Sequence, residues 1–173
     1  MILPDSGERR QFESGAVRDI AQGKGRCDLM PLSVLGRWTG DMLLIHIDRY
    51  LYTGNTGFLR DVMEVFIDSE YSEDIYTAIL EVAKHFEDGA VKYGDRNWEK
   101  GIPVHCYIDS AVRHYLKFRR GDEDEPHSRA FLWNILCAIW THENHPELID
   151  IPAYKLTKKE YECNECNSCT SNT

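Results

Sequence analysis

The sequence predicts an all-α fold, a compact helical bundle of about five helices. Apolar residues recur at three- and four-residue spacings in several segments, and glycine or proline separates these segments. No segment alternates apolar and polar residues over the length of a strand, and no internal repeat is present. The 173 residues suffice for one hydrophobic core, because a chain of this size buries roughly 70% of its unfolded surface. We therefore expect one helical domain over residues 32–145, preceded by an extended arm (1–31) and followed by an irregular tail (146–173).

The first two predicted helices lie in residues 32–79. The first begins at Pro31 or Leu32 and ends near Tyr52, before Gly54. Its buried stripe is expected to comprise Leu35, Trp38, Met42 and Ile45. The second helix is capped by Thr56, ends around Asp68 and carries the stripe Leu59, Val62, Met63 and Phe66.

The three remaining helices follow the same reasoning. Ser72 is expected to cap the third helix, which ends at Gly94 and has the stripe Ile75, Ile79, Val82 and Phe86. The fourth begins at Pro103, ends at Gly121 and carries the stripe Val104, Ile108, Ala111, Tyr115 and Phe118. The fifth starts after the acidic turn 122–125 and Pro126, and its apolar residues face most directions, so we expect it at the centre of the bundle.

Charge and hydropathy exclude two classes of protein. Lys and Arg number 20 against 29 Asp and Glu, a formal charge of -9 without a basic stripe, which argues against binding along duplex nucleic acid. Charged residues interrupt the apolar runs, and the N-terminus lacks the pattern of a signal peptide, so we expect neither a membrane span nor secretion. The expected location is the cytoplasm, or the host cytoplasm for a phage protein.

The cysteines divide into two groups. Cys27, Cys106 and Cys137 stand alone, and a thiol in an apolar helix such as Cys137 behaves as a small hydrophobic group. Cys163, Cys166 and Cys169 form CxxCxxC, a spacing that can place thiolates on one zinc ion. The alternative for this tail is a polar terminus with free thiols.

The stretch 85–101 is one candidate binding segment. Tyr93 and Trp98 can stack on a base, Asn97 can read a base edge, and Lys92 can contact a phosphate. The alternative is that Trp98 fills one end of the bundle and Lys92 is solvated.

The hairpin of the fourth and fifth helices is a second candidate. His114 precedes Gly121 by seven residues and His127 follows it by six, so an antiparallel pair brings both imidazoles to a similar depth. Asp109 enters from the fourth helix, and Asn134 lies two turns beyond His127 on the same face. Imidazole and carboxylate groups bind divalent metals or act as bases, although single histidines in helices are often hydrogen-bonded fillers. His85 has Glu81 and Asp88 one turn away on either side, which indicates either an ion site or a charged surface.

The arm is the third candidate. Arg18, Lys24 and Arg26 stand close to glycines, and free backbone amides together with guanidinium groups suit an oligophosphate. Disorder of the arm is the alternative.

Four blocks of the sequence carry a family resemblance: SGERRQFESGAVRDIAQGKGRCDLMP in the arm, HFEDGAVKYGDRNWEKGIP, DSAVRH and HSRAFLWNILCAIW. They resemble phage and bacterial proteins of the dATP/dGTP diphosphohydrolase N-terminal domain family. The resemblance covers residues 5–31 and about 80–142, and residues 32–79 look like an insertion. It implies a helical protein that acts on purine deoxynucleoside triphosphates and releases pyrophosphate with the help of a divalent metal.

The resemblance carries over to particular positions. The matching residues are Gly15, Arg18, Asp19, Lys24, Arg26 and Asp28 in the arm, His85, Lys92, Tyr93, Asn97 and Trp98 in the block, and Asp109, His114, His127 and Asn134 in the hairpin. The paired-glutamate pattern of better understood all-α pyrophosphohydrolases is absent.

The leading hypothesis is a metal-dependent nucleotide hydrolase. Asp109, His114 and His127, with His85 and Asp88, are expected to hold Mg or Mn and orient a water. We expect the phosphates of the substrate to be bound by Arg18, Lys24, Arg26 and Lys92. The base is expected to face Tyr93, Asn97 and Trp98, and Asn134 is a further residue expected to bind substrate. The alternatives are a nucleotide-binding protein without turnover, which sequesters a host signalling nucleotide, and a protein-interaction adaptor that uses the net acidic insertion. A homo-oligomer, such as a dimer, is expected in each case.

Overall fold

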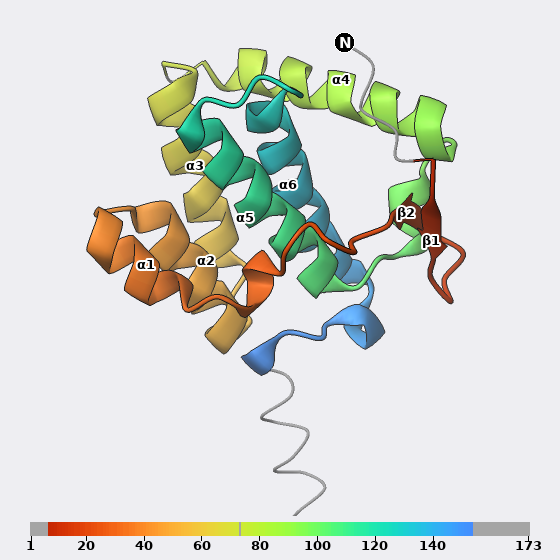
Figure 1. Cartoon of the computed structure of the whole chain (residues 1–173), viewed down its shortest axis with the longest axis horizontal. Helices are drawn as coiled ribbons and strands as arrows, with labels where there is room; N and C mark the ends of the chain where they lie inside the picture. Colours follow the sequence, from red (N-terminus) through yellow and green to blue (C-terminus); the bar gives the residue numbers. More distant parts are fainter. Residues whose placement is uncertain (1–6, 73, 154–173) are drawn as a thin grey trace, which may run out of the picture.

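The computed structural model describes residues 7–72 and 74–153, and the predicted all-α class is confirmed. The helices of this part of the chain are α1 (Leu32–Thr39), α2 (Met42–Thr53), α3 (Gly57–Glu70), α4 (Ile75–Tyr93), α5 (Val104–Arg120) and α6 (His127–Asn144). Figure 1 shows α5 and α6 side by side at the centre, with α2 and α3 on one side of them and α4 along the top of the view. The CxxCxxC tail lies outside the described residues.

The central position predicted for the fifth helix is confirmed in α6. Phe131, Leu132, Ile135, Cys137 and Ala138 are all buried there. Phe131 stacks edge-on against Phe66 of α3 at 4.8 Å between ring centroids. The core thus joins α3, α5 and α6, which fixes the α5–α6 hairpin that carries several candidate site residues.

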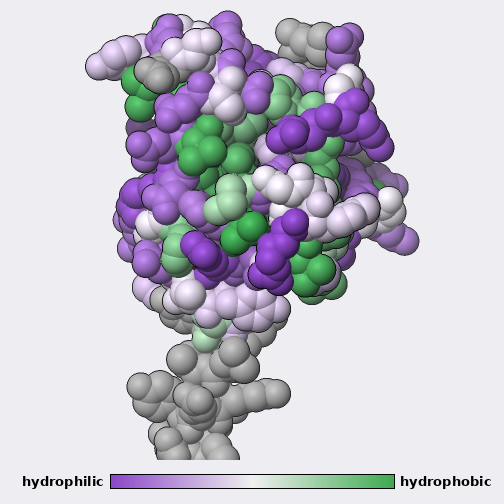
Figure 2. Space-filling view, turned by 90° about the vertical axis from the view of Figure 1, so that its left-hand side faces the viewer, coloured by the Kyte–Doolittle hydropathy of each residue, from purple (hydrophilic) through white to green (hydrophobic). Residues whose placement is uncertain are grey.

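The single helix predicted from Leu32 to Tyr52 is wrong, because the chain breaks it into α1 and α2. Gly40 takes a left-handed conformation with φ of +76°, and the Asp41 carboxylate then accepts a hydrogen bond from the backbone N–H of Leu43 at 3.1 Å. Trp38 is 83% exposed and Met42 49% exposed, so these two residues of the predicted stripe do not lie in the core, whereas Leu35 packs against it. Figure 2 views the molecule from the side of α1 and α2, where apolar side chains gather within a mainly polar surface.

The third predicted helix is α4, but its orientation differs from the prediction. Asp74, rather than Ser72, is the N-cap, and its side chain accepts from the backbone N–H of Thr77 at 3.0 Å. Ile79 is 54% exposed, whereas Val82 and His85 are buried. The helix therefore turns His85 toward the interior and leaves part of the expected stripe in solvent.

The arm contains two short strands, which the sequence did not predict. β1 (Arg9–Gln11) and β2 (Val17–Asp19) pair in antiparallel fashion, and Arg10 lies opposite Arg18. Gly15 permits the turn between them because its φ is +81°. A short 3₁₀-helix η1 (Cys27–Leu29) follows and packs on α5.

Two further 3₁₀-helices complete the described structure. η2 (Asn97–Lys100) links α4 to α5, and η3 (Pro146–Leu148) follows α6. Ile151 is buried in the core beyond η3, so the chain after α6 folds back onto the bundle. Within the described ranges, no helix combines the length and hydropathy needed to cross a bilayer.

Candidate functional site

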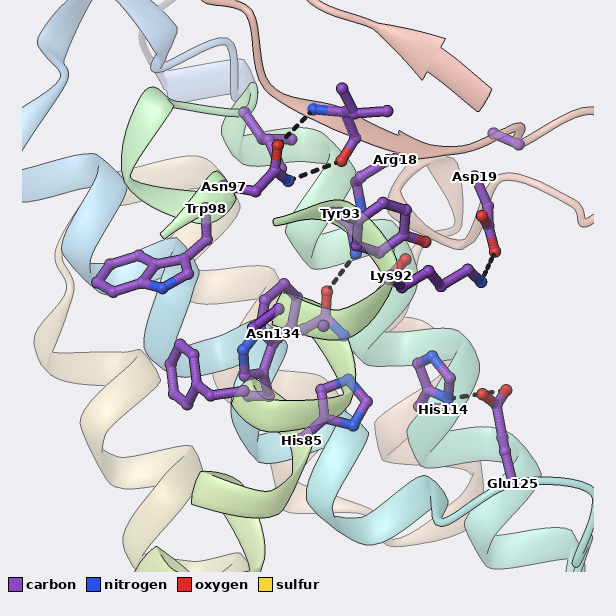
Figure 3. A pocket seen from close by; sticks show the side chains of 18 of the residues that line it. Arg18, Asp19, His85, Lys92, Tyr93, Asn97, Trp98, His114, Glu125 and Asn134 are labelled. Carbon is purple, nitrogen blue, oxygen red and sulfur yellow. Dashed lines mark hydrogen bonds and ion pairs between the residues drawn. The ribbon is translucent and has the colours of Figure 1, made fainter. Parts of the chain in front are cut away.

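A cavity of about 900 Å³ lies between the arm, α4, η2 and the α5–α6 hairpin. Such a volume falls within the usual range of small-molecule sites, roughly 300–1,000 Å³. The predicted site residues that line it are Arg18, Lys24, His85, Lys92, Tyr93, Asn97, Trp98, Asp109, His114 and Asn134. Segments that are distant in sequence thus contribute to one cavity (Figure 3).

Arg18 lines this cavity and contacts three neighbouring side chains. Its Nη2 donates a hydrogen bond to Oδ1 of Asn134 at 2.7 Å. The guanidinium lies over the ring of Tyr107 at 5.0 Å and near Trp133 at 5.8 Å. Its Nη1 atom is buried and has no hydrogen-bond partner within the described chain. The cation is therefore oriented by neutral groups, and one of its donors remains available.

His85 and Trp133 present two more polar groups at the cavity wall. His85 is only 8% exposed, and its ring centroid lies 5.3 Å from that of Trp133. His85 Nδ1 and Trp133 Nε1 are both buried without a partner among the described residues. Burial, followed by the charges of Arg129 and Arg18, lowers the pKa of His85 to about 4, so its imidazole is neutral at pH 7.

The two asparagines predicted to contact substrate are both engaged inside the protein. Asn97 accepts from the backbone N–H of Val17 at 2.9 Å and donates to the carbonyl oxygen of Val17 at 2.8 Å. Asn134 accepts from Arg18 and donates to the carbonyl oxygen of Ala130 at 2.8 Å. Asn97 therefore anchors strand β2, and Asn134 orients Arg18.

The two aromatic residues of the 85–101 block have different surroundings. Trp98 stacks edge-on against Trp140 at 4.8 Å and against Phe86 at 5.4 Å, so it fills one end of the bundle. Tyr93 lies on the cavity wall beneath the guanidinium of Arg9 at 5.2 Å. Burial raises the pKa of Tyr93, which keeps its phenol neutral.

Basic side chains surround the cavity, and several are paired with acids. Lys92 Nζ lies 2.7 Å from Asp19, and Lys117 Nζ lies 2.8 Å from Asp124. Burial lowers the pKa of Lys24, which also lines the cavity. Arg26 lines no part of it and pairs with Asp28 instead, with Nε 2.7 Å from Oδ1.

Sequence reasoning missed four basic residues of the cavity wall, namely Arg10, Arg96, Arg113 and Lys117. The four-residue spacing of Asp109, Arg113 and Lys117 along α5 was the available signal, since it places all three on one face of the helix. Arg113 donates to the carbonyl oxygen of Lys24 at 3.2 Å and also pairs with Asp109, so it ties the arm to α5.

The hairpin brings His114 and His127 together, with 3.1 Å between their Nδ1 atoms. Oε1 of Glu125, a residue that the sequence reasoning overlooked, lies 3.5 Å from Nδ1 of His114 and 3.6 Å from Nδ1 of His127. Its place in the acidic turn directly before α6 was the only signal. Burial, followed by the proximity of His127, keeps the pKa of His114 well below its usual range, so this imidazole is neutral.

The carboxylates predicted to join the two histidines lie elsewhere. Asp109 accepts from the backbone N–H of Cys27 at 2.7 Å and pairs with Arg113. Asp88 pairs with Arg129 at 2.6 Å. Among the described residues, neither forms a group of three potential metal ligands with the histidines, whereas Glu125 does.

Comparison with known proteins supports the family resemblance. Residues 72–151 match the family model described as dATP/dGTP diphosphohydrolase, N-terminal. The matched segment comprises α4, η2, α5, α6 and η3, and most of the residues that line the cavity lie within it. Searches of curated proteins and of solved structures gave no match.

Proposed function

We propose that the cavity binds a purine deoxynucleoside triphosphate and that the protein hydrolyses it to release pyrophosphate, in keeping with the match of residues 72–151 to the dATP/dGTP diphosphohydrolase N-terminal family model. One observation carries the binding part of this proposal. Arg18, His85 and Trp133 line the same cavity, and each has a buried polar atom without a partner among residues 7–72 and 74–153. Leaving such groups unsatisfied costs about 1–3 kcal/mol each, so a polar ligand that pairs with them gains affinity.

The two ends of the cavity suit different parts of a nucleotide. Near Arg18, indole and phenol rings surround two unpartnered donors and a neutral imidazole, a combination suited to the flat, polar edge of a purine. Lys24, Arg113 and Lys117 approach from the arm and α5, where their charges suit phosphates. We therefore place the base near Trp133 and the phosphates near His114.

A divalent metal also fits the phosphate end. His114, Glu125 and His127 are suitable donors because their ligand atoms lie within 3.6 Å of one another. When bound, such a metal stabilises charge on phosphate oxygens and assists a nucleophilic water. In this proposal, Arg113 and Lys117 hold the phosphates beside these donors, while Arg18 and Tyr93 keep the nucleotide oriented along the cavity.

The test is product analysis with dATP and dGTP in the presence of Mg²⁺, Mn²⁺ or Zn²⁺. We expect deoxynucleoside monophosphate and pyrophosphate in equal amounts, and a loss of turnover in His114→Ala. The control is His46→Ala, since His46 lies on α2 and lines no part of the cavity. Absence of both products with every metal, or full turnover in His114→Ala, would contradict the catalytic part.

One observation favours a second candidate function, nucleotide binding without turnover. Two of the four aspartates of the cavity wall, Asp19 and Asp109, are engaged in ion pairs, so neither is free to act as a base. Mass spectrometry of the nucleotide recovered after incubation separates the two functions. Intact nucleotide indicates sequestration, monophosphate indicates hydrolysis, and failure to bind any nucleotide below millimolar concentration leaves the adaptor hypothesis.

A further inference from the structure

We propose that His114, Glu125 and His127 bind a single transition-metal ion of the zinc class (Zn²⁺, Co²⁺ or Mn²⁺) in preference to Mg²⁺. The three residues come from the last turns of α5, the acidic turn and the first residue of α6. This proposal deepens the proposed function and rests on it for the metal's catalytic role, while metal binding itself is measurable without nucleotide.

The geometry of the three ligand atoms matches such an ion. Their separations are 3.1, 3.5 and 3.6 Å. Ligands at 2.0–2.1 Å from a tetrahedral zinc ion lie roughly 3.3 Å apart, so only small movements are needed to close the site. Both imidazoles present the same type of atom, Nδ1, toward this point.

Asp124 orients one of the two imidazoles. Its Oδ1 lies 2.8 Å from Nε2 of His127, the ring nitrogen opposite the proposed ligand atom. A carboxylate that accepts the second N–H of a ligand histidine fixes its tautomer and strengthens metal binding. In His127, this contact assigns the proton to Nε2 and leaves Nδ1 unprotonated, so that its lone pair can bind a metal.

The surroundings leave room for a substrate or water as a further ligand. His127 has 1% of its side chain exposed and is not among the residues that line the cavity. His114 and Glu125 both line the cavity, and Figure 3 shows them facing each other across its edge. Three protein ligands with an open position are the arrangement found in catalytic rather than structural zinc sites.

The donor set determines the class of metal. Mg²⁺ prefers an octahedral shell of oxygen atoms and retains several waters, whereas two imidazole nitrogens and one carboxylate suit Zn²⁺, Co²⁺ or Mn²⁺. Only Glu125 supplies oxygen among the three residues. We therefore expect the site to discriminate against Mg²⁺ when no nucleotide is present.

The experiment measures metal binding without nucleotide, by calorimetry with Zn²⁺ and by visible absorption with Co²⁺. Cys163, Cys166 and Cys169 are replaced by serine in every protein used, because thiolates at that spacing bind the same metals. The variants are Glu125→Gln and His114→Gln, and the matched control is His46→Ala. Circular dichroism checks that each variant is folded.

We expect one ion per chain, intense Co²⁺ absorption typical of a site with fewer than six ligands, and no displacement by millimolar Mg²⁺. Glu125→Gln and His114→Gln should each weaken Zn²⁺ binding by more than about 100-fold, since even outer-sphere changes cost about 10- to 100-fold. Asp124→Asn should weaken it by that smaller factor. Unchanged affinity in both folded ligand variants, or no binding in the parent, would overturn the proposal. Metal binding without hydrolysis would leave the site standing and refute the hydrolase.

Discussion

Replacing Arg18 by methionine should weaken nucleotide binding strongly while changing the stability of the free protein little. In the part of the chain that the structure describes, the Arg18 guanidinium has a buried Nη1 without a partner, and Asn134 alone accepts a hydrogen bond from this side chain, at 2.7 Å. A hydrogen bond to a charged group contributes about 1.5–3 kcal/mol. Since 1.4 kcal/mol corresponds to a tenfold change, we expect Kd for dGTP and dATP to rise about 10- to 150-fold.

Two opposing effects on stability should nearly cancel in Arg18→Met. The variant frees the acceptor of Asn134, which is destabilising, but it also removes a partly buried cation that has no carboxylate partner in the described chain. Methionine keeps an apolar stem against Tyr107 and Trp133. A net effect within about 1 kcal/mol corresponds to a Tm change within about 2–4 °C for a chain of this size.

The assay is isothermal titration of dGTP and dATP, with Tm measured on the same samples. The matched control is Arg60→Met, because Arg60 is exposed and pairs with Glu143, away from the cavity. Unchanged Kd in a folded Arg18→Met protein would refute the assignment of the buried donors to a nucleotide.

Three further predictions concern contacts that hold the fold together. Asn97→Ala removes two hydrogen bonds to Val17, of 2.9 and 2.8 Å, so it should lower the free energy of unfolding by about 1–3 kcal/mol and speed hydrogen exchange at the Val17 amide. Unchanged exchange would contradict the anchoring role of Asn97. Hydrogen bonds with Asp150 and, to a smaller extent, with Cys106 raise the pKa of His105 to about 9. The stability that protonated His105 contributes is therefore fully present below pH 6.5 and is lost as the pH rises through 9. Asp150→Asn should return this pKa toward 6.5 in an NMR titration and should reduce stability more at pH 6 than at pH 10; equal losses would argue against the linkage. Gly36→Ala should lower the free energy of unfolding, measured by urea denaturation, by about 1–3 kcal/mol, because the added Cβ would lie 2.6 Å from the backbone carbonyl oxygen of Asp41. A neutral effect would show that α1 and α2 can separate.

The helices that have regular apolar spacing and clear terminators could be predicted from the sequence. α5 follows the expected stripe from Val104 and ends before Gly121, and α6 is buried at the centre as its composition indicated. The break between α1 and α2 could not be predicted by periodicity, because apolar residues continue across it. The break depends on the left-handed conformation of Gly40, on the N-cap Asp41 and on the close approach of Asp41 and Ile45 to Gly36.

The candidate site could be predicted only in outline. The spacing of His114 and His127 on either side of Gly121 sufficed to predict that the two imidazoles lie close together. Which carboxylate joins them depends on tertiary contacts. Asp109 is engaged by Cys27 of the arm, so Glu125 of the turn is the acid that lies beside the pair.

The roles of Asn97 and Asn134 could not be predicted from the sequence either. An amide side chain in a glycine-rich segment can read a base or hold a strand, and only the contacts of Asn97 with Val17 distinguish these roles. The unpartnered atoms of Arg18 and Trp133 are likewise a property of packing, since burial and pairing are fixed by several elements at once.

The most direct test of nucleotide binding in the cavity is the NMR signal of the Trp133 indole N–H during a titration with dGTP. The chain has 4 tryptophans, and a Trp133→Phe spectrum assigns the resonance. We predict that saturation with dGTP shifts the Trp133 signal strongly, because its donor gains an acceptor, while the signal of Trp38, which is 83% exposed and lines no part of the cavity, stays in place. A Trp133 signal that does not move while dGTP binds would contradict the proposed site.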